Sequence, residues 1–240
     1  LIDYGTYEML IDGGRYGACA AYIPSYIDGA LEVMVATHPD ADHIGGLNDG
    51  LDAFVVEEIW LNGDNATTQT YTDFMNKVNA EGAQVYQAQR GDQISLSDLT
   101  FDVLHPTLPL GSDKNENSIV LEHFFGQVGF LFTGDVESGG EASMLAAGLV
   151  NDIDILKVSH HGSKYCSTAD FLAAALPEIA VYSAGANNPY GHPAPETITR
   201  LDDVGATIYG TDVHGTIVVT TDGITYDVEP TNQVPPVTPS

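Results

Sequence analysis

Four side chains that can bind a metal ion lie within one short segment, residues 38–43, which reads His-Pro-Asp-Ala-Asp-His. The segment directly follows an apolar run at 31–36 and precedes the pair Gly45-Gly46, which lets the chain turn sharply. Imidazole and carboxylate are ligands for zinc and for harder divalent ions. A polar loop with incidental histidines is the simpler alternative, but similar clusters recur along the chain. The segment therefore predicts a metal site.

Three later segments repeat this arrangement of an apolar run followed by His or Asp. Asp135 ends Thr-Gly-Asp, His160 and His161 follow the run 153–158, and His192 lies in Tyr-Gly-His-Pro. A single Asp after Gly is also typical of a turn, but beside the other clusters Asp135 is predicted to be a bridging carboxylate. Loops at one edge of a sheet commonly build enzyme sites, so we expect these segments to converge.

Alternating strand and helix patterns position these segments. The expected strands are 8–12, 31–36, 57–61, 84–88, 99–105, 118–125, 128–132, 153–158, 179–183, 207–209, 216–221 and 225–228, and the expected helices are 18–27, 44–54, 68–81, 141–149, 169–175 and 196–204. Two β-rich sectors, each joined to helices, indicate an α/β protein with two packed sheets and helices outside.

The length of 240 residues and the 43% content of hydrophobic residues fit one domain over 1–229 and exclude global disorder. Residues 230–240 are rich in Pro and Thr, which predicts a linker or tail. No apolar run is long enough to predict a transmembrane helix. The chain opens on an apolar Leu1-Ile2, which suggests a processed end.

The charge is strongly acidic, with 34 acidic residues against 7 basic ones and a formal net charge of -27. This excludes an ordinary nucleic-acid-binding module, which carries a basic face. It does not exclude an enzyme that acts on nucleic acid, because bound metal ions can reverse the local charge. We interpret the acidity as a halophilic adaptation to concentrated salt, with a merely acidic surface as the alternative.

Taken together, HPDADHIGG, NENS, TGD, KVSHHGS and YGHP resemble the metallo-β-lactamase superfamily, in particular the ComEC-type competence nuclease domain and its stand-alone secreted relatives. The resemblance covers residues 1–228 and implies a four-layer αβ/βα sandwich with two divalent metal ions, Zn or Mn, at one edge. It also implies an extracellular or secreted location. The subgroup's opening strand and Asp-x-Gly-Gln-Gly-Asp turn do not precede Leu1, so we expect one sheet edge to be incomplete.

The resemblance also implies the ligands. One metal is expected on His38, Asp40 and Asp135. The other is expected on Asp42, His43, Asp135 and a histidine of the 160–161 pair, with His160 favoured over His161 and the second of the pair orienting the first or touching substrate. Asp12 matches a buried Asp that supports the site, and a turn Asp before two glycines is its alternative.

Two departures from the family pattern matter. Asp40 stands where most members carry His, and the usual next His is replaced by the region of Asn115 and Asn117. Both changes put an oxygen ligand where an imidazole is usual. Oxygen is a harder ligand, in the hard–soft acid–base sense, so the first metal site should favour Mn²⁺ over Zn²⁺.

His192 is expected to be a proton donor or phosphate contact, with a structural histidine that hydrogen-bonds before Pro193 as the alternative. Asp42 is expected to be a catalytic residue. Substrate contacts are expected from Asn115, Asn117, Lys157 and Lys164, with solvated surface lysines as the alternative for the last two. A metal-bound hydroxide then attacks phosphorus or a carbonyl carbon. The first hypothesis is a phosphodiesterase or nuclease acting on single-stranded DNA or another phosphodiester. The alternatives are a small-substrate hydrolase (lactonase, esterase or β-lactamase-like) and a non-catalytic binding module. A Cys19–Cys166 disulfide is expected if the protein is secreted.

Overall fold

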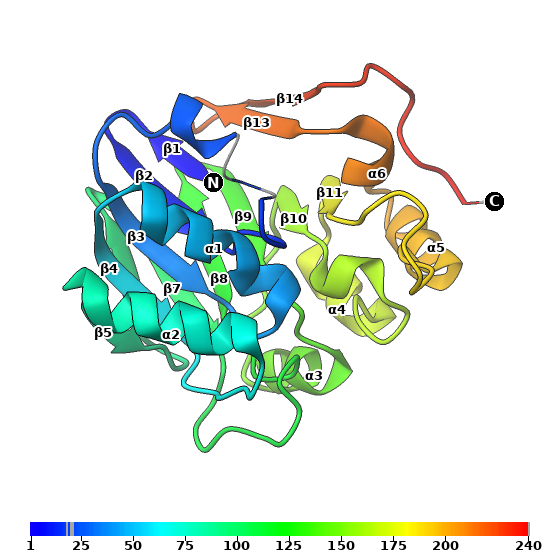
Figure 1. Ribbon diagram of the computed structural model, residues 1–240. Coiled ribbons are helices and arrows are strands. Elements are labelled where there is room, and N and C mark those ends of the chain that lie inside the picture. Colours follow the sequence, from blue (N-terminus) through cyan, green and yellow to red (C-terminus); the bar gives the residue numbers. More distant parts are fainter. Residues whose placement is uncertain (18, 20–21, 240) are drawn as a thin grey trace. The chain divides into compact units, whose positions relative to one another are not determined.

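The computed structural model describes residues 1–17, 19 and 22–239. The chain divides into two compact units, residues 1–119 and 120–240. Each unit contains strands and helices, coloured blue to green in the first and green to red in the second (Figure 1). None of the helices in the described part of the chain is both long and apolar enough to cross a membrane.

The first unit is built on a five-stranded sheet in the order β1-β2-β3-β4-β5. Its strands are β1 (Ile2–Tyr4), β2 (Tyr7–Ile11), β3 (Leu31–Ala36), β4 (Val56–Leu61) and β5 (Gln84–Gln87). The strands β2 to β5 run parallel, and β1 pairs antiparallel with β2. The run Leu-Glu-Val-Met-Val-Ala of β3 is almost wholly buried, as expected of a central parallel strand.

Two helices cover one face of this sheet, α1 (Ala41–Ala53) and α2 (Gln69–Glu81) (Figure 1). Their apolar side chains pack with those of β2, β3 and β4 in a single core. Thr68 caps α2, because its hydroxyl accepts the Tyr71 N–H at 3.2 Å, and Gly82 ends the helix in a left-handed conformation. A hairpin of β6 (Gln93–Leu96) and β7 (Leu99–His105) completes the unit.

The predicted helix over 18–27 is wrong where the structure describes it. Residues 18, 20 and 21 lie outside the described residues, and Ile23–Ser25 forms only one 3₁₀ turn, η1. Pro24 explains the difference, because its ring removes a backbone N–H and disfavours a continuing α-helix.

The second unit has strands in the order β12-β11-β10-β9-β8. They are β8 (Val120–Phe125), β9 (Val128–Phe132), β10 (Ile155–Lys157), β11 (Ile179–Tyr182) and β12 (Thr207–Gly210). The strands β9 to β12 are parallel, and β8 pairs antiparallel with β9. The carboxyl ends of the parallel strands therefore lie at one edge.

Four helices accompany these strands: α3 (Ser138–Ala146), α4 (Ala169–Ala175), α5 (Pro195–Asp203) and α6 (Thr211–His214). A hairpin of β13 (Ile217–Thr221) and β14 (Tyr226–Pro230) packs its apolar side chains against those of β9, β10 and β11. Beyond it, Val237 pairs with Ile208 of β12, so the part of the predicted tail that the structure describes contacts the body.

Candidate metal centre and active site

The side chains expected to bind metal in the first unit follow the ends of neighbouring parallel strands. Asp12 comes directly after β2, and His38 follows β3. Asp42 and His43 lie in the first turn of α1, which begins at Ala41, three residues before the predicted start. The metal-binding segment 38–43 thus spans a strand end and a helix start.

His43 is paired with Asp12. The Nδ1 atom of His43 lies 2.7 Å from Oδ2 of Asp12. The same carboxylate accepts the backbone N–H of Thr37 at 2.9 Å and the Thr37 hydroxyl at 2.7 Å. Because a carboxylate accepts hydrogen bonds, Nδ1 carries the ring proton and Nε2 keeps its lone pair. A metal-binding histidine requires this tautomer.

The surroundings of Asp12 keep it ionised. Burial alone would raise the pKa of its carboxyl group, but the neighbouring imidazoles of His43 and His38 and the hydrogen bonds from His43 and the Thr37 amide together lower that pKa below its ordinary value. Asp12 also has a backbone φ of 54°, a left-handed conformation that Asp tolerates better than most residues. Such strain is common at functional sites.

Two glycines let the Asp12 loop pack directly on the start of α1. A Cβ on Gly13 would lie 2.4 Å from the backbone nitrogen of Leu47, and one on Gly46 would lie within contact of the Gly13 oxygen. The Gly13 N–H donates to the His43 carbonyl at 2.8 Å. Only residues without a side chain fit this approach, which holds Asp12 beside His43.

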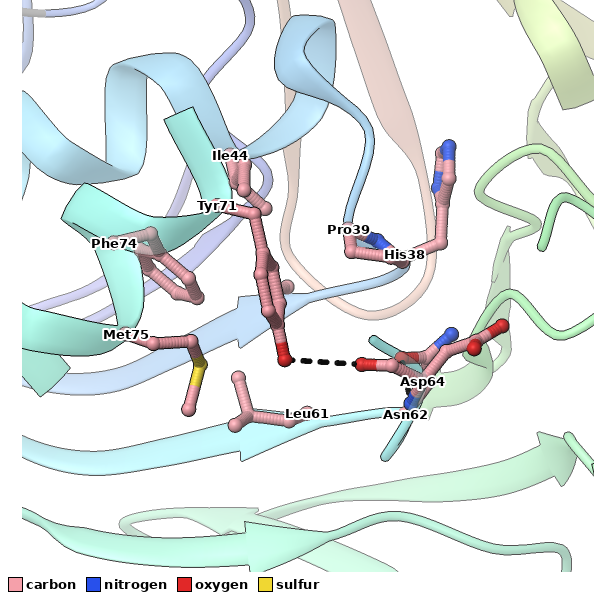
Figure 2. Close-up of a pocket in the computed structure, with 10 residues that line it drawn as sticks. His38, Pro39, Ile44, Leu61, Asn62, Asp64, Tyr71, Phe74 and Met75 are labelled. Atoms are coloured by element: carbon pink, nitrogen blue, oxygen red, sulfur yellow. Dashed lines mark hydrogen bonds between the residues drawn. The ribbon is translucent and has the colours of Figure 1, made fainter. Parts of the chain in front are cut away.

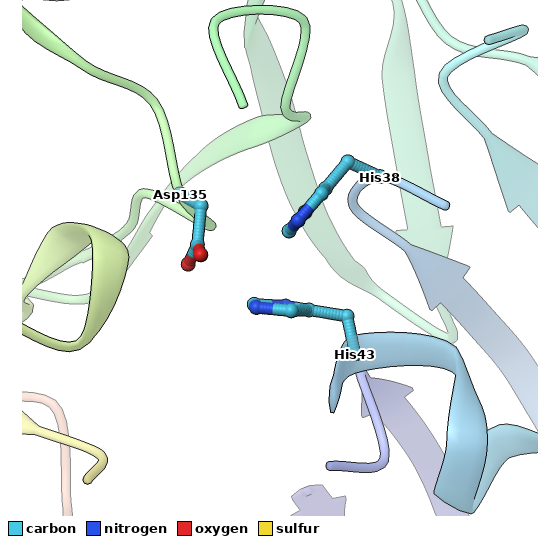
Figure 3. A group of neighbouring side chains, drawn as sticks. All are labelled: His38, His43 and Asp135. Carbon is cyan, nitrogen blue, oxygen red and sulfur yellow. The ribbon is translucent and has the colours of Figure 1, made fainter. Parts of the chain in front are cut away.

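His38 is buried beside His43, with ring centroids 4.1 Å apart and planes inclined at 54°. Figure 3 shows the His38 ring, from the end of β3, and the His43 ring, from α1, pointing to the same side of the first unit. Asp135, which is also drawn, belongs to the second unit. The Nε2 atom of His38 lies 3.9 Å from Oδ2 of Asp40. Asp40 is the N-cap of α1 but makes no side-chain cap, so its carboxylate is not used by the helix.

The second unit gathers its candidate ligands at the carboxyl ends of β9, β10 and β11. Asp135 follows β9, His160 and His161 follow β10, and His192 lies in the loop after β11. The Nε2 atoms of His160 and His161 lie 3.8 Å and 3.4 Å from the same oxygen, Oδ2 of Asp135. One carboxylate oxygen therefore faces two imidazole nitrogens.

The other ring nitrogen of each histidine has a partner in the second unit. Nδ1 of His161 lies 2.7 Å from the Ser183 carbonyl oxygen, and Nδ1 of His160 lies 3.0 Å from Oε1 of Glu137. Both histidines adopt left-handed backbone conformations, with φ values of 54° and 45°. Residues other than glycine rarely adopt positive φ values, and here two adjacent ones do. This indicates that the surroundings of the site impose the conformation.

His192 lies next to the histidine pair. Its ring meets that of His160 edge-on, with centroids 5.7 Å apart. Burial, followed by the charges of His160 and His161, lowers the pKa of His192 below its ordinary value. Its buried Nδ1 atom has no hydrogen-bond partner among the residues that the structure describes.

The expected substrate contacts have varied surroundings. Asn117 is buried; its amide donates to Asp64 at 2.8 Å and to the Gly111 carbonyl at 2.9 Å, and its oxygen accepts the Gly111 N–H. Asn115 is partly buried in the same loop. Lys157 donates to the Val158 carbonyl at 3.0 Å, and the Lys164 ammonium lies 5.2 Å from the Tyr165 ring centroid.

The expected disulfide is wrong, because Cys19 and Cys166 are both free thiols. Each has its own backbone acceptors: Cys19 Sγ lies 3.0 Å from the Gly46 oxygen, and Cys166 Sγ lies 3.0 Å from the Ser159 oxygen. Burial raises the pKa of the Cys19 thiol to about 11. Neither residue is a reactive thiolate near neutral pH.

Three residues that position the site were not identified from the sequence. Thr37 donates twice to Asp12, the Ser118 hydroxyl lies 3.4 Å from Nδ1 of His38, and Glu137 accepts from His160. Ser118 belongs to the NENS segment, and Glu137 follows Asp135 by two residues. Their nearness in sequence to expected ligands was the only available signal.

A small hollow of about 20 Å³, enough for about one water molecule, lies beside His38 within the first unit. Figure 2 shows Phe74 and Met75 of α2 on its apolar side, with Asn62 and Asp64 opposite. The Tyr71 hydroxyl reaches across to the Asp64 carbonyl oxygen at 3.3 Å.

The donor atoms of both units fit divalent metal ions. His43 and His161 each direct Nδ1 at an acceptor, which leaves Nε2 as the ligand atom, and the carboxylates of Asp40 and Asp135 supply oxygen. Mixed imidazole and carboxylate donors suit zinc and manganese.

Comparison with known proteins identifies the family. The model of the metallo-beta-lactamase superfamily matches residues 1–186, and the chain belongs to this superfamily. Membership supports a metal-dependent hydrolase that binds divalent ions. The structure is similar to YhfI from Bacillus subtilis (TM-score 0.54, 12% identity, covering 87% of this chain and 85% of that chain). It is also similar to Tm1679, a metal-dependent hydrolase (TM-score 0.53, 14% identity, 85% of both). The predicted αβ/βα fold class is confirmed.

The curated relatives are competence-related proteins, as the sequence motifs suggested. ComE operon protein 3 of Bacillus subtilis (strain 168) is 32% identical over 187 residues, which are 78% of this chain and 24% of that protein. Competence protein ComA of Neisseria gonorrhoeae is 29% identical over 222 residues, 90% of this chain and 30% of that protein. The chain spans less than a third of the length of these relatives.

Proposed function

We propose that the chain is a metal-dependent phosphodiesterase that cleaves nucleic acid strands. One observation carries this proposal. Oδ2 of Asp135 lies 3.8 Å from Nε2 of His160 and 3.4 Å from Nε2 of His161. Because the Nδ1 atoms of both histidines already face acceptors, their Nε2 lone pairs point toward a negative oxygen. A cation between them relieves this repulsion.

The ligand sets that the family resemblance implies draw on both units. His38, Asp40 and Asp135 would hold one ion, and Asp42, His43, Asp135 and a histidine of the 160–161 pair would hold the other. A bound divalent ion lowers the pKa of water and neutralises charge on a phosphoryl group. The oxygen-rich character of the first set favours Mn²⁺ there.

Of the pair, we favour His161 as the ligand. Its Nε2 is the closer one to Asp135, and its Nδ1 donates to a backbone carbonyl, which fixes the ring orientation. His160 is held instead by the Glu137 carboxylate. In this arrangement His160 orients the neighbouring ring of His192.

The chain's own residues bind, orient and transfer protons. Asp12 holds the ring of His43 and keeps its ligand nitrogen unprotonated, and Asp42 is the catalytic carboxylate of the first unit. His192 gives a proton to the leaving oxygen, a role supported by its place beside His160.

The substrate class is supported by the relatives, whose names refer to competence and, for Recombination protein 2 of Haemophilus influenzae (28% identical over 189 residues), to recombination. The net charge of -27 opposes DNA binding at low salt. Concentrated salt screens that repulsion, which agrees with a secreted protein that works in saline surroundings.

A substrate panel tests the proposal. The metal-loaded protein is assayed with bis-p-nitrophenyl phosphate, linear single-stranded DNA, a lactone and a cephalosporin, and we expect turnover of the first two. His161→Ala should lower phosphodiester kcat by at least about 100-fold, and His160→Ala should lower it less. Asp152→Asn, which removes an exposed carboxylate of the same unit, is the matched control and should be unaffected.

A further inference from the structure

Tyr190 presents its ring to solvent beside the histidines of the second unit. Its side chain is 67% exposed. The ring lies 6.0 Å from that of His192, with the two planes inclined at only 16°. His192 in turn contacts His160. Three rings therefore lead from the candidate ligands to the surface.

Asn188 fixes the loop that carries Tyr190. Its Oδ1 accepts the backbone N–H of Tyr190 at 3.2 Å and that of His192 at 3.1 Å. Its Nδ2 donates to the carbonyls of Gly185 at 3.0 Å and His192 at 2.5 Å. Because one side chain holds the backbone on both sides of Gly191, the Tyr190 ring is placed before any ligand arrives, and less ordering entropy is lost on binding.

Two of the three basic side chains of the second unit are engaged by backbone carbonyls. Arg200 donates to the carbonyls of Lys164, Cys166 and Ser167, and Lys157 donates to that of Val158. The third, Lys164, lies over the Tyr165 ring. The whole chain has only 7 basic residues. Proteins that bind nucleic acid through charge need several free Lys or Arg contacts. Stacking of bases on aromatic rings is the other general source of affinity for single strands.

We propose that Tyr190 is a stacking residue that binds an unpaired nucleobase next to the cleaved phosphodiester, so that the site selects single strands over intact duplex. This inference rests on the proposed phosphodiesterase function. In a duplex both faces of each base are covered by neighbouring bases, and an exposed ring on a fixed loop cannot reach them. Tyr190 thus determines specificity, and Asn188 is a positioning residue that acts through it.

Binding is measured by the quenching of 2-aminopurine fluorescence in a short single-stranded oligonucleotide. The metal-loaded protein is used with Ca²⁺ to limit cleavage, in molar NaCl to screen charge repulsion. Tyr190→Ala should weaken binding by about 5- to 100-fold, and Tyr190→Trp should retain it. Tyr190→Leu keeps the apolar bulk without a π-face and should behave like Tyr190→Ala.

Phe124→Ala is the matched control, because it removes an exposed aromatic side chain from β8 opposite the start of β9, whereas Asp135 follows the end of β9. It should bind like the wild type. An oligonucleotide of the same length with abasic sites should bind wild type and Tyr190→Ala equally.

Unchanged binding of the 2-aminopurine strand by Tyr190→Ala, or an equal loss on the abasic strand, would overturn the stacking role. The proposed function fails separately. A wild-type protein that quenches 2-aminopurine through Tyr190 but hydrolyses no phosphodiester contradicts that function and leaves the stacking residue in place.

Discussion

The Nδ1 atom of His43 lies 2.7 Å from Oδ2 of Asp12, and this contact joins the loop after β2 to the first turn of α1. It fixes the tautomer and the orientation of a candidate metal ligand through a residue that need not touch the metal. Carboxylate–histidine pairs of this kind raise ligand basicity. Substitution of Asp12 therefore tests whether His43 binds a metal ion.

Asp12→Asn should lower metal affinity by about 10- to 100-fold, because Asn keeps the shape but loses the charge that holds the His43 proton. Asn also tolerates the φ of 54° at this position, so the backbone is not strained by the change. Titration calorimetry with Mn²⁺ and Zn²⁺ measures the effect. Asp52→Asn, which removes an exposed carboxylate paired with Lys77, is the control. Equal affinities of a folded Asp12→Asn variant and the wild type would contradict this role.

The strands that carry the site can be predicted from the sequence. Parallel strands such as β3 and β9 are buried on both faces and read as short apolar runs, each followed directly by His or Asp. Because the ends of parallel strands share one edge, the sequence also indicates which side chains gather within each unit. These two rules account for the positions of His38, Asp135 and the pair His160-His161.

Other features depend on contacts that no local pattern encodes. Helix α1 begins at Ala41, before the apolar period starts, because the extended backbone of Asp40 ends the preceding loop. The strand β6 is only four residues long and gains its stability from pairing with β7. The left-handed backbone of His160 and His161 and the contact of Glu137 with His160 arise from tertiary packing.

Glu8 predicts a pH-dependent stability. Its side chain is fully buried in β2, and neither carboxylate oxygen has a hydrogen-bond partner among the described residues. Burial, followed by the charges of Glu32, Asp28 and Asp3, raises its pKa to about 7. The folded state thus prefers the protonated form, and stability falls as the pH rises from the ordinary Glu pKa through about 7.

Glu8→Gln should remove this dependence, because the amide stays neutral. Urea unfolding at pH 5 and pH 8 should show a wild-type loss of about 1–3 kcal/mol that the variant largely lacks. Glu57→Gln, at an exposed position of β4, is the control and should lose as much unfolding free energy between pH 5 and pH 8 as the wild type. Parallel pH profiles for Glu8→Gln and the wild type would mean that Glu8 is not the responsible group.

The net charge of -27 predicts stabilisation by salt. At low ionic strength the acidic side chains repel one another over a Debye length of about 30 Å at 0.01 M, and this distance shrinks as salt is added. The melting temperature should climb from millimolar to molar NaCl, by about 2–4 °C for each kcal/mol of repulsion relieved. Scanning calorimetry in NaCl, with sucrose as an uncharged control, measures it. A flat or falling curve with NaCl would mean that the acidity is not a salt adaptation.

The last prediction concerns the metal itself. The first proposed ligand set would combine one imidazole with the carboxylates of Asp40 and Asp135, whereas the second would contain two imidazoles. Oxygen-rich sets suit Mn²⁺, and imidazole-rich sets suit Zn²⁺. Protein stripped with EDTA should therefore recover phosphodiester hydrolysis better with Mn²⁺ than with Zn²⁺ alone, and metal analysis should find the second set filled more completely. Asp135→Asn should abolish activity under either metal, because both sets share that carboxylate, and Asp152→Asn should not. Two tightly held zinc ions with full activity and no gain from Mn²⁺ would contradict this assignment.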